Sequence, residues 1–173
     1  MKLESIIRTI PDFPKQGIMF KDITTVLKNA EALQYCVNSF YEYYKNKKIS
    51  KVIGIESRGF IIGTALAYRL GVGFVPIRKP GKLPAEKIRQ EYQLEYGTDT
   101  IEMHKDAITP GERVILHDDV LATGGTMQAA CKMVKQLGGN IVGLSFLIEL
   151  AFLQPRNKLS GFDIHSLVSY DAE

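Results

Sequence analysis

Two adjacent carboxylates and a glycine-rich loop make up the most informative segment of this sequence. Asp118 and Asp119 end an apolar stretch, and the run Ala122-Thr123-Gly124-Gly125-Thr126 follows almost at once. Glycines let a ligand approach the backbone closely, and the loop's N–H groups and threonine hydroxyls can donate to a phosphate. Carboxylates beside such a loop are explained if the ligand also carries hydroxyls, as a ribose does. The segment therefore indicates a sugar-phosphate site, the alternative being an acidic strand end before an ordinary helix cap.

A second polar loop and a group of cations suggest contacts to further phosphates. The loop Glu56-Ser57-Arg58-Gly59 lies between an apolar stretch and a helical pattern. Its N–H groups and the Arg58 guanidinium suit a diphosphate, although a salt-bridged helix cap has the same residue types. Arg78, Lys79 and Lys82 follow the next apolar stretch. They suit a leaving pyrophosphate, and a solvated charged surface is the alternative.

The elements that must position these loops follow a repeated strand–loop–helix–strand order. Apolar runs predict strands at 52–55, 73–77, 113–117 and 141–147, and the patterns between them predict helices at 60–70 and 126–137. Helices are also predicted at 2–9 and 30–47, and a β-hairpin within 79–109. Such βαβ units predict an α/β fold whose parallel sheet is covered on both faces. Ligands of these sheets lie beyond the carboxyl ends of the strands, where both loops fall.

Composition and charge narrow the class of protein. The chain has 173 residues, 45% of them hydrophobic and 24% charged, which predicts one globular domain over 1–173. A net charge of +3 predicts neither a nucleic-acid partner nor a membrane surface. No apolar run approaches the roughly 20 residues that cross a bilayer, and the N-terminus does not have a signal-peptide pattern. Cys36 and Cys131 are expected to be buried free thiols of a cytoplasmic protein.

The segment from Val114 to Thr126 resembles the motif with which type I phosphoribosyltransferases bind 5-phosphoribosyl 1-pyrophosphate (PRPP). Four other segments resemble the adenine-using branch of that family: Phe13 to Thr24, Glu56 to Phe60, Arg78 to Pro84 and Tyr92 to Gly97. The resemblance extends over nearly the whole chain. It implies a single domain with a central, mostly parallel sheet flanked by helices. It also implies an N-terminal hood (about 1–30) and a flexible β-hairpin lid (about 79–104).

The resemblance also implies an activity with its cofactor and partners. The ribose 5-phosphate of PRPP would be transferred to N9 of adenine, giving AMP and pyrophosphate for purine salvage. The implied cofactor is Mg²⁺, held mainly through PRPP with a water-mediated contact to Asp118 or Asp119 as an option, and the implied assembly is a homodimer. Two other uses of the fold stay open: transfer to another nucleobase, and a PRPP-binding regulatory protein.

The implied site residues fall into three overlapping sets. Residues for PRPP or AMP are Glu56, Ser57, Arg58, Gly59, Arg78, Lys79, Lys82, Asp118, Asp119, Ala122, Thr123, Gly124, Gly125 and Thr126. Residues for adenine are Met19, through its backbone, Phe20, Lys21, Glu95 and Leu150. Residues for catalysis are Glu95, Asp118, Asp119, Arg58, Lys79 and Lys82. The family also implies a cis peptide in the loop 56–59, whereas His117 is interpreted as a packed strand residue.

Overall fold

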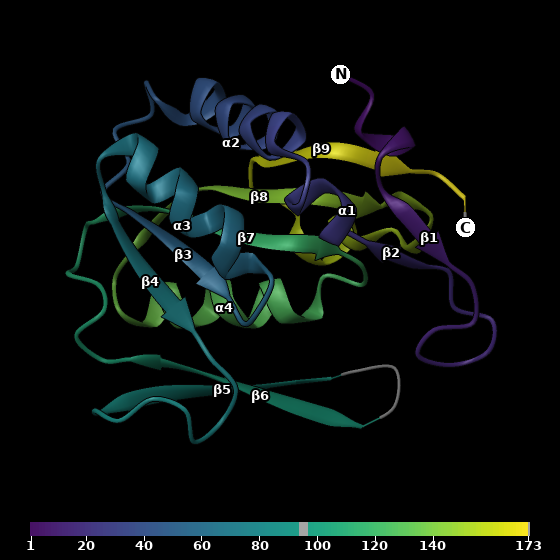
Figure 1. Ribbon diagram of the computed structural model, residues 1–173. Helices are drawn as coiled ribbons and strands as arrows, with labels where there is room; N and C mark the ends of the chain where they lie inside the picture. Colours follow the sequence, from purple (N-terminus) through teal and green to yellow (C-terminus); the bar gives the residue numbers. More distant parts are fainter. Residues whose placement is uncertain (94–96, 173) are drawn as a thin grey trace.

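A five-stranded parallel sheet forms the centre of the computed structural model, which describes residues 1–93 and 97–172. Its strand order is β4-β3-β7-β8-β9. The bounds are β3 (Lys51–Ile55), β4 (Gly73–Ile77), β7 (Arg113–Leu121), β8 (Asn140–Leu150) and β9 (Ile164–Tyr170). The helices α2 (Ala30–Tyr44) and α3 (Gly59–Leu70) cover one face, and α4 (Gly125–Gln136) covers the other (Figure 1). The α/β fold with a parallel sheet is confirmed.

Burial on both faces explains the continuous apolar runs of the strands. In β7, Val114 and Leu116 pack in the core that contains Met133 of α4. Ile115 points to the opposite face and packs in the core that contains Phe40 of α2. The strand β7 therefore packs against both cores at once.

The hood differs from the helix that we predicted over residues 2–9. A 3₁₀ turn, η1 (Leu3–Ser5), precedes β1 (Arg8–Ile10), which pairs antiparallel with β2 (Phe20–Asp22), and α1 (Thr24–Leu27) follows. The prediction of a helix is wrong. Leu3 and Ile7 are buried at the spacing that is typical of a helix, but the backbone after them pairs with a distant segment instead of continuing as a helix. Phe20 accordingly lies in a strand rather than in the turn region that the sequence suggested.

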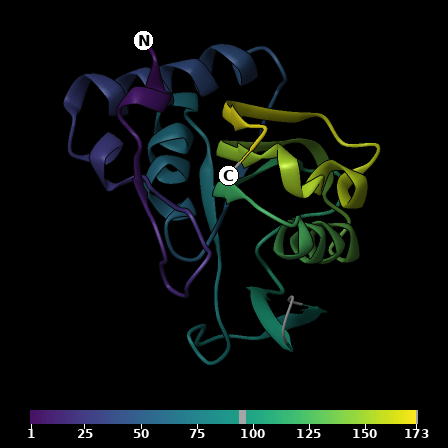
Figure 2. The same cartoon turned by 90° about the vertical axis from the view of Figure 1, so that its right-hand side faces the viewer.

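The predicted hairpin is confirmed as β5 (Lys87–Gln93) paired antiparallel with β6 (Thr98–His104). It lies beside α4, at the edge of the molecule away from α2 (Figures 1 and 2). A bridge between Arg78 and Glu102 ties the hairpin to the segment after β4. The described part of the hairpin is therefore tied to the segment that leaves the carboxyl end of β4.

Several strands extend beyond the boundaries that the sequence predicted. Both acids, expected at the start of a loop, lie inside β7, because β7 stays paired with β8 up to Leu121 and Glu149. The edge strand β9 was not predicted, since its residues form neither a continuous apolar run nor a regular alternation, and most of the strand is only half-buried. Two 3₁₀ turns, η2 (Ala151–Leu153) and η3 (Pro155–Leu159), connect β8 to β9.

Two expectations about single features are supported by the structure. Cys36 and Cys131 are both buried and free, and burial raises the pKa of each thiol to about 12. In the described part of the chain, no helix has the combined length and apolarity that crossing a membrane requires.

Candidate functional site

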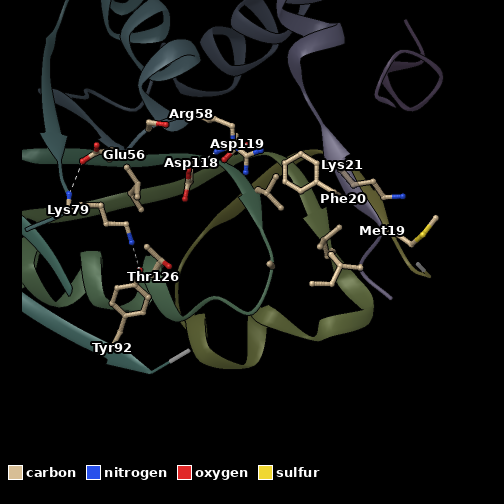
Figure 3. Close-up of a pocket in the computed structure, with 16 residues that line it drawn as sticks. Met19, Phe20, Lys21, Glu56, Arg58, Lys79, Tyr92, Asp118, Asp119 and Thr126 are labelled. Atoms are coloured by element: carbon tan, nitrogen blue, oxygen red, sulfur yellow. Dashed lines mark hydrogen bonds and ion pairs between the residues drawn. The ribbon is translucent and has the colours of Figure 1, made fainter. Parts of the chain in front are cut away.

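The carboxyl ends of β3, β7 and β8 meet the hood and the lid around one pocket of about 370 Å³. Its lining includes most of the residues predicted for the site: Met19, Phe20, Lys21, Glu56, Ser57, Arg58, Lys79, Asp118, Asp119, Ala122, Thr126 and Leu150. Figure 3 shows side chains from these separate elements facing one space. Residues more than a hundred positions apart are thus brought together, as expected for the open end of a parallel sheet.

The two carboxylates lie side by side in the floor of this pocket (Figure 3). Burial raises the pKa of Asp118 well above its ordinary value, and the charge of Asp119 adds to that effect. Burial also raises the pKa of Asp119, against the opposing charge of Arg58. Arg58 Nε lies 2.8 Å from Asp119 Oδ2, but the geometry does not align a hydrogen bond. A positive charge or hydroxyl donors beside the pair would favour the ionised forms, and the carboxylates would then accept hydrogen bonds from ligand hydroxyls or stabilise that positive charge.

Arg58 lies closer to the hood than the sequence suggested. Its guanidinium carbon is 5.1 Å from the centre of the Phe20 ring, while its Nε faces Asp119. We predicted this side chain for the pyrophosphate, together with Lys79 and Lys82. In the described structure it joins the carboxylate pair to the aromatic wall of the pocket. The peptide between Glu56 and Ser57 is cis, as the resemblance implies.

The Glu56 carboxylate contacts the cationic residues that follow β4. It accepts a hydrogen bond of 2.8 Å from the Lys79 N–H, lies 2.5 Å from Lys82 Nζ and is 3.4 Å from Arg78 Nε. Burial raises the pKa of Glu56, but the hydrogen bonds from Lys82, Lys79 and Arg78 outweigh it and lower the pKa to about 2. Glu56 thus organises the cations, and neither Arg78 nor Lys82 lines the pocket in this structure.

We expect Glu56 to stabilise the protein in a pH-dependent way. Its pKa falls from 4.5 to about 2 on folding, so its contribution is complete above pH 4.5 and is lost as the pH falls toward 2. Urea unfolding of the wild type and of Glu56→Gln should differ most above pH 4.5 and converge at lower pH. The exposed Glu86, in Glu86→Gln, is the control and should show little difference. A Glu56→Gln effect that is constant from pH 6 to pH 2.5 would contradict the expectation.

The loop 122–126 forms a second, smaller cavity of about 80 Å³ that opens beside Asp118. Gly124 has a φ of 80°, in the left-handed region, and a Cβ there would lie 3.0 Å from the Pro155 carbonyl oxygen. Only glycine meets both conditions without strain. Gly125 then begins α4, so unpaired N–H groups and the positive end of the helix dipole face this cavity. The arrangement suits a phosphate, as the sequence predicted.

The hood contributes an aromatic wall to the pocket. The Phe20 ring lies beside Asp119, whereas the side chain of Met19 points away from it (Figure 3). Leu150, at the end of β8, lines the same pocket. The Lys21 ammonium group points away as well, because it donates to Thr9 Oγ1 at 3.2 Å and lies over the Tyr170 ring. The charge of Lys21 is therefore not directed at the position expected for the base.

The lid contributes a residue that the sequence reasoning missed. Tyr92 of β5 lines the pocket, and its hydroxyl lies 3.2 Å from Lys79 Nζ. Lys79 also forms an ion pair with Asp99 of β6. An aromatic residue on a mostly polar hairpin strand is the signal that could have identified Tyr92. Glu95, predicted as a catalytic and adenine-binding residue, lies outside the described residues.

His117 is a packed strand residue, as interpreted from the sequence. It is fully buried beside Asp118, and its Nδ1 lies 2.6 Å from Ser145 Oγ. Burial lowers the pKa of the imidazole to about 3, so the ring is neutral at physiological pH. Its packing supports β7 and β8 behind the carboxylates.

Comparisons with known proteins agree with this geometry. The model of the phosphoribosyl transferase domain family matches residues 22–158. The adenine phosphoribosyltransferase of Alkaliphilus oremlandii is 58% identical over 171 residues, which cover 99% of each chain. The crystal structure of adenine phosphoribosyltransferase from Thermoanaerobacter pseudethanolicus has a TM-score of 0.95 and 54% identity over 98% of both chains. The Saccharomyces cerevisiae enzyme, in a structure complexed with adenine and an imino-altritol bisphosphate, has a TM-score of 0.91 and 41% identity over 96% of both chains.

Proposed function

Because this chain belongs to the phosphoribosyltransferase family, we propose that it transfers the 5-phosphoribosyl group of PRPP to N9 of adenine, giving AMP and pyrophosphate. The relatives named as adenine phosphoribosyltransferases cover nearly its whole length. The observation that carries the proposal is the joint pocket in which a carboxylate pair, a phosphate loop and the Phe20 ring face one space. This combination provides for a ribose, its 5′-phosphate and a flat base at the same site.

The two walls of the pocket support the binding of a flat base. Phe20 from the hood and Leu150 from β8 both line it, and they can hold a flat ring between them. Phe13 packs edge-on against Phe20 with a centroid distance of 5.1 Å, which orients the stacking ring. Adenine placed there would stand above the ribose held by Asp118 and Asp119.

The chemistry at C1 of the ribose follows from these positions. The bond from C1 to the pyrophosphate oxygen breaks as the bond from N9 to C1 forms, so positive charge builds on the ribose and negative charge on the leaving group. Asp118 and Asp119 would accept hydrogen bonds from the ribose hydroxyls and stabilise the cationic sugar. Lys79 lines the pocket and would contact the pyrophosphate. Glu95, which the family places near N7 of adenine, remains a prediction for the proton of the base.

Mg²⁺ is part of the proposal, and the donor set fits it. The pocket has two adjacent carboxylates, whose hard oxygens suit this ion. Among the described residues there is no group of three His, Cys, Asp or Glu side chains that would form a protein cage. PRPP and water would therefore supply most ligands, and Asp118 or Asp119 would contribute through water. When bound, the ion would neutralise charge on the pyrophosphate.

A single assay tests the proposed function. The purified protein is incubated with PRPP, Mg²⁺ and each of adenine, guanine, hypoxanthine, xanthine and orotate in turn, and nucleotide products are separated by chromatography. We expect AMP from adenine as the dominant product. A dominant product from another base would reassign the substrate, and PRPP binding without any nucleotide product would favour a regulatory protein.

Gly59 should be essential for the position of the carboxylates. A Cβ at this residue would lie 2.9 Å from the His117 carbonyl oxygen and 3.0 Å from Asp118 Oδ1. Gly59→Ala should therefore displace Asp118 and lower kcat about tenfold or more, although alanine favours the helix that begins there. Gly73→Ala is the control, because its Cβ would meet only Lys51 at 3.6 Å. Steady-state kinetics of both variants check the expectation, and an unchanged kcat in Gly59→Ala would contradict it.

We also propose that the chain works as a homodimer in the cytoplasm. Ile61 and Tyr68 of α3 are exposed apolar residues, Tyr68 with 88% of its surface accessible, and this exposure supports a self-association surface. The buried free thiols fit a reducing compartment. Light scattering should give a mass of about twice the 19.4 kDa of the chain, and Tyr68→Glu should shift it toward the monomer. A monomeric mass for the wild type at working concentration would refute the dimer.

A further inference from the structure

We propose that Glu149 and Arg156 form a positioning pair that holds the phosphate loop, Ala122 to Thr126, from behind without touching the substrate. The inference rests on the proposed function, and it concerns a part of the molecule outside the pocket. Neither residue lines the main pocket or the small cavity of the loop. Their effect on PRPP must therefore pass through the residues that they hold in place.

The pair is unusually well formed for two residues outside the site. The Glu149 side chain is only 4% exposed, and both of its oxygens accept from Arg156, Nε to Oε1 and Nη2 to Oε2, each at 2.7 Å. Ser166 of β9 donates a third hydrogen bond at 2.9 Å. Such a bidentate contact fixes the direction of the guanidinium as well as its distance. A buried carboxylate at the end of β8 thus fixes one point of the turn that follows.

That turn is the support of the phosphate loop. Arg156 belongs to η3, and its neighbour Pro155 places its carbonyl oxygen 3.0 Å from the position of a Cβ on Gly124. On the other side of Arg156, the Lys158 carbonyl accepts from Gln128 Nε2 of α4 at 3.1 Å, and Leu159 is buried in the core that α4 covers. The turn therefore contacts both the loop and the helix whose N-terminus faces the phosphate.

Leu150, which forms the wall of the pocket proposed to contact adenine, is held in place independently of the ion pair. Leu150 follows Glu149 directly, but β8 remains paired with β9 at this point, with Leu150 opposite Tyr170. Loss of the ion pair should consequently loosen η3 and the phosphate loop more than the wall. The expected sign of the proposal is a change on the PRPP side of the reaction with little change on the adenine side.

The experiment uses the full chain and begins with the wild type, whose formation of AMP from adenine and PRPP tests the proposed function alone. Arg156→Met should raise KM for PRPP about tenfold and change KM for adenine less than twofold. Arg156→Lys, which restores the charge without the bidentate contact, should recover part of the loss. The double variant Glu149→Gln with Arg156→Met leaves no unpaired buried charge, so it reports on positioning even if the single variant folds poorly.

A matched control removes another partly buried ion pair at the opposite end of the sheet. Lys51 lies 2.7 Å from Glu112, and Lys51→Met should leave both KM values unchanged. Calorimetry with ribose 5-phosphate gives a readout without turnover, and about tenfold weaker binding is expected in the double variant. This binding result decides the role of the pair even if the wild type makes no AMP. Equal losses on the PRPP and adenine sides, or a fall in kcat with both KM values unchanged, would overturn the proposal.

Discussion

Replacing either carboxylate of β7 by its amide, Asp118→Asn or Asp119→Asn, should lower kcat about a hundredfold or more. The positive charge that develops on the ribose lies beside these side chains in the proposed mechanism. An amide keeps the shape of the side chain but removes the charge that stabilises the transition state. The effect should fall on kcat more than on KM, because the interaction strengthens as charge develops.

The same substitutions should not weaken the fold. Burial raises the pKa of both carboxyls, which means that folding disfavours their charged forms. The free energy of unfolding should therefore stay the same or rise in Asp118→Asn. In Asp119→Asn any rise should be smaller, because this variant loses the ion pair between Asp119 and Arg58. Denaturant unfolding and steady-state kinetics on the same preparations separate the two effects. Exposed Asp106, in Asp106→Asn, is the control, and near-normal turnover in both β7 variants would remove them from the ribose site.

The second large effect concerns the choice of base. We expect kcat/KM for adenine to exceed that for hypoxanthine by at least tenfold to a hundredfold. The Met19 backbone carbonyl can accept from the exocyclic amine of adenine, whereas hypoxanthine has a carbonyl there. Leaving a buried acceptor unpaired costs about 1–3 kcal/mol, and about 1.4 kcal/mol is a factor of ten. Comparable kcat/KM values for the two bases would contradict the assignment to adenine but not the family.

Two hood variants separate backbone recognition from side-chain recognition. Met19 is 38% exposed and its side chain points away from the Phe20 ring, so Met19→Ala should keep the preference for adenine (Figure 3). Phe20→Ala should raise KM for adenine, since the stacking surface and the contact of 5.1 Å with Arg58 are both lost. A loss of base preference in Met19→Ala would show that its side chain, and not the backbone, reads the base.

Local patterns in the sequence determined much of the fold and most of the candidate site. Strands buried on both faces appear as apolar runs, and the loops at their ends carry the glycines and charged residues that a phosphate site needs. The loops 56–59 and 122–126, and the acid pair before the second loop, could therefore be identified from residue types alone. The resemblance added the hood and the adenine residues, whose individual segments are uninformative by themselves.

Only the tertiary structure decided which partner each charged side chain takes. Arg58 turns to Asp119 and Phe20, Lys79 pairs with Asp99, and the charge of Lys21 points away from the pocket. The hood strands and β9 could not be predicted from the sequence either, because strands at an edge or in a small pair are defined by their pairing with a distant segment. Periodicity records which face of an element is buried, but pairing between segments far apart in the chain depends on how the elements pack.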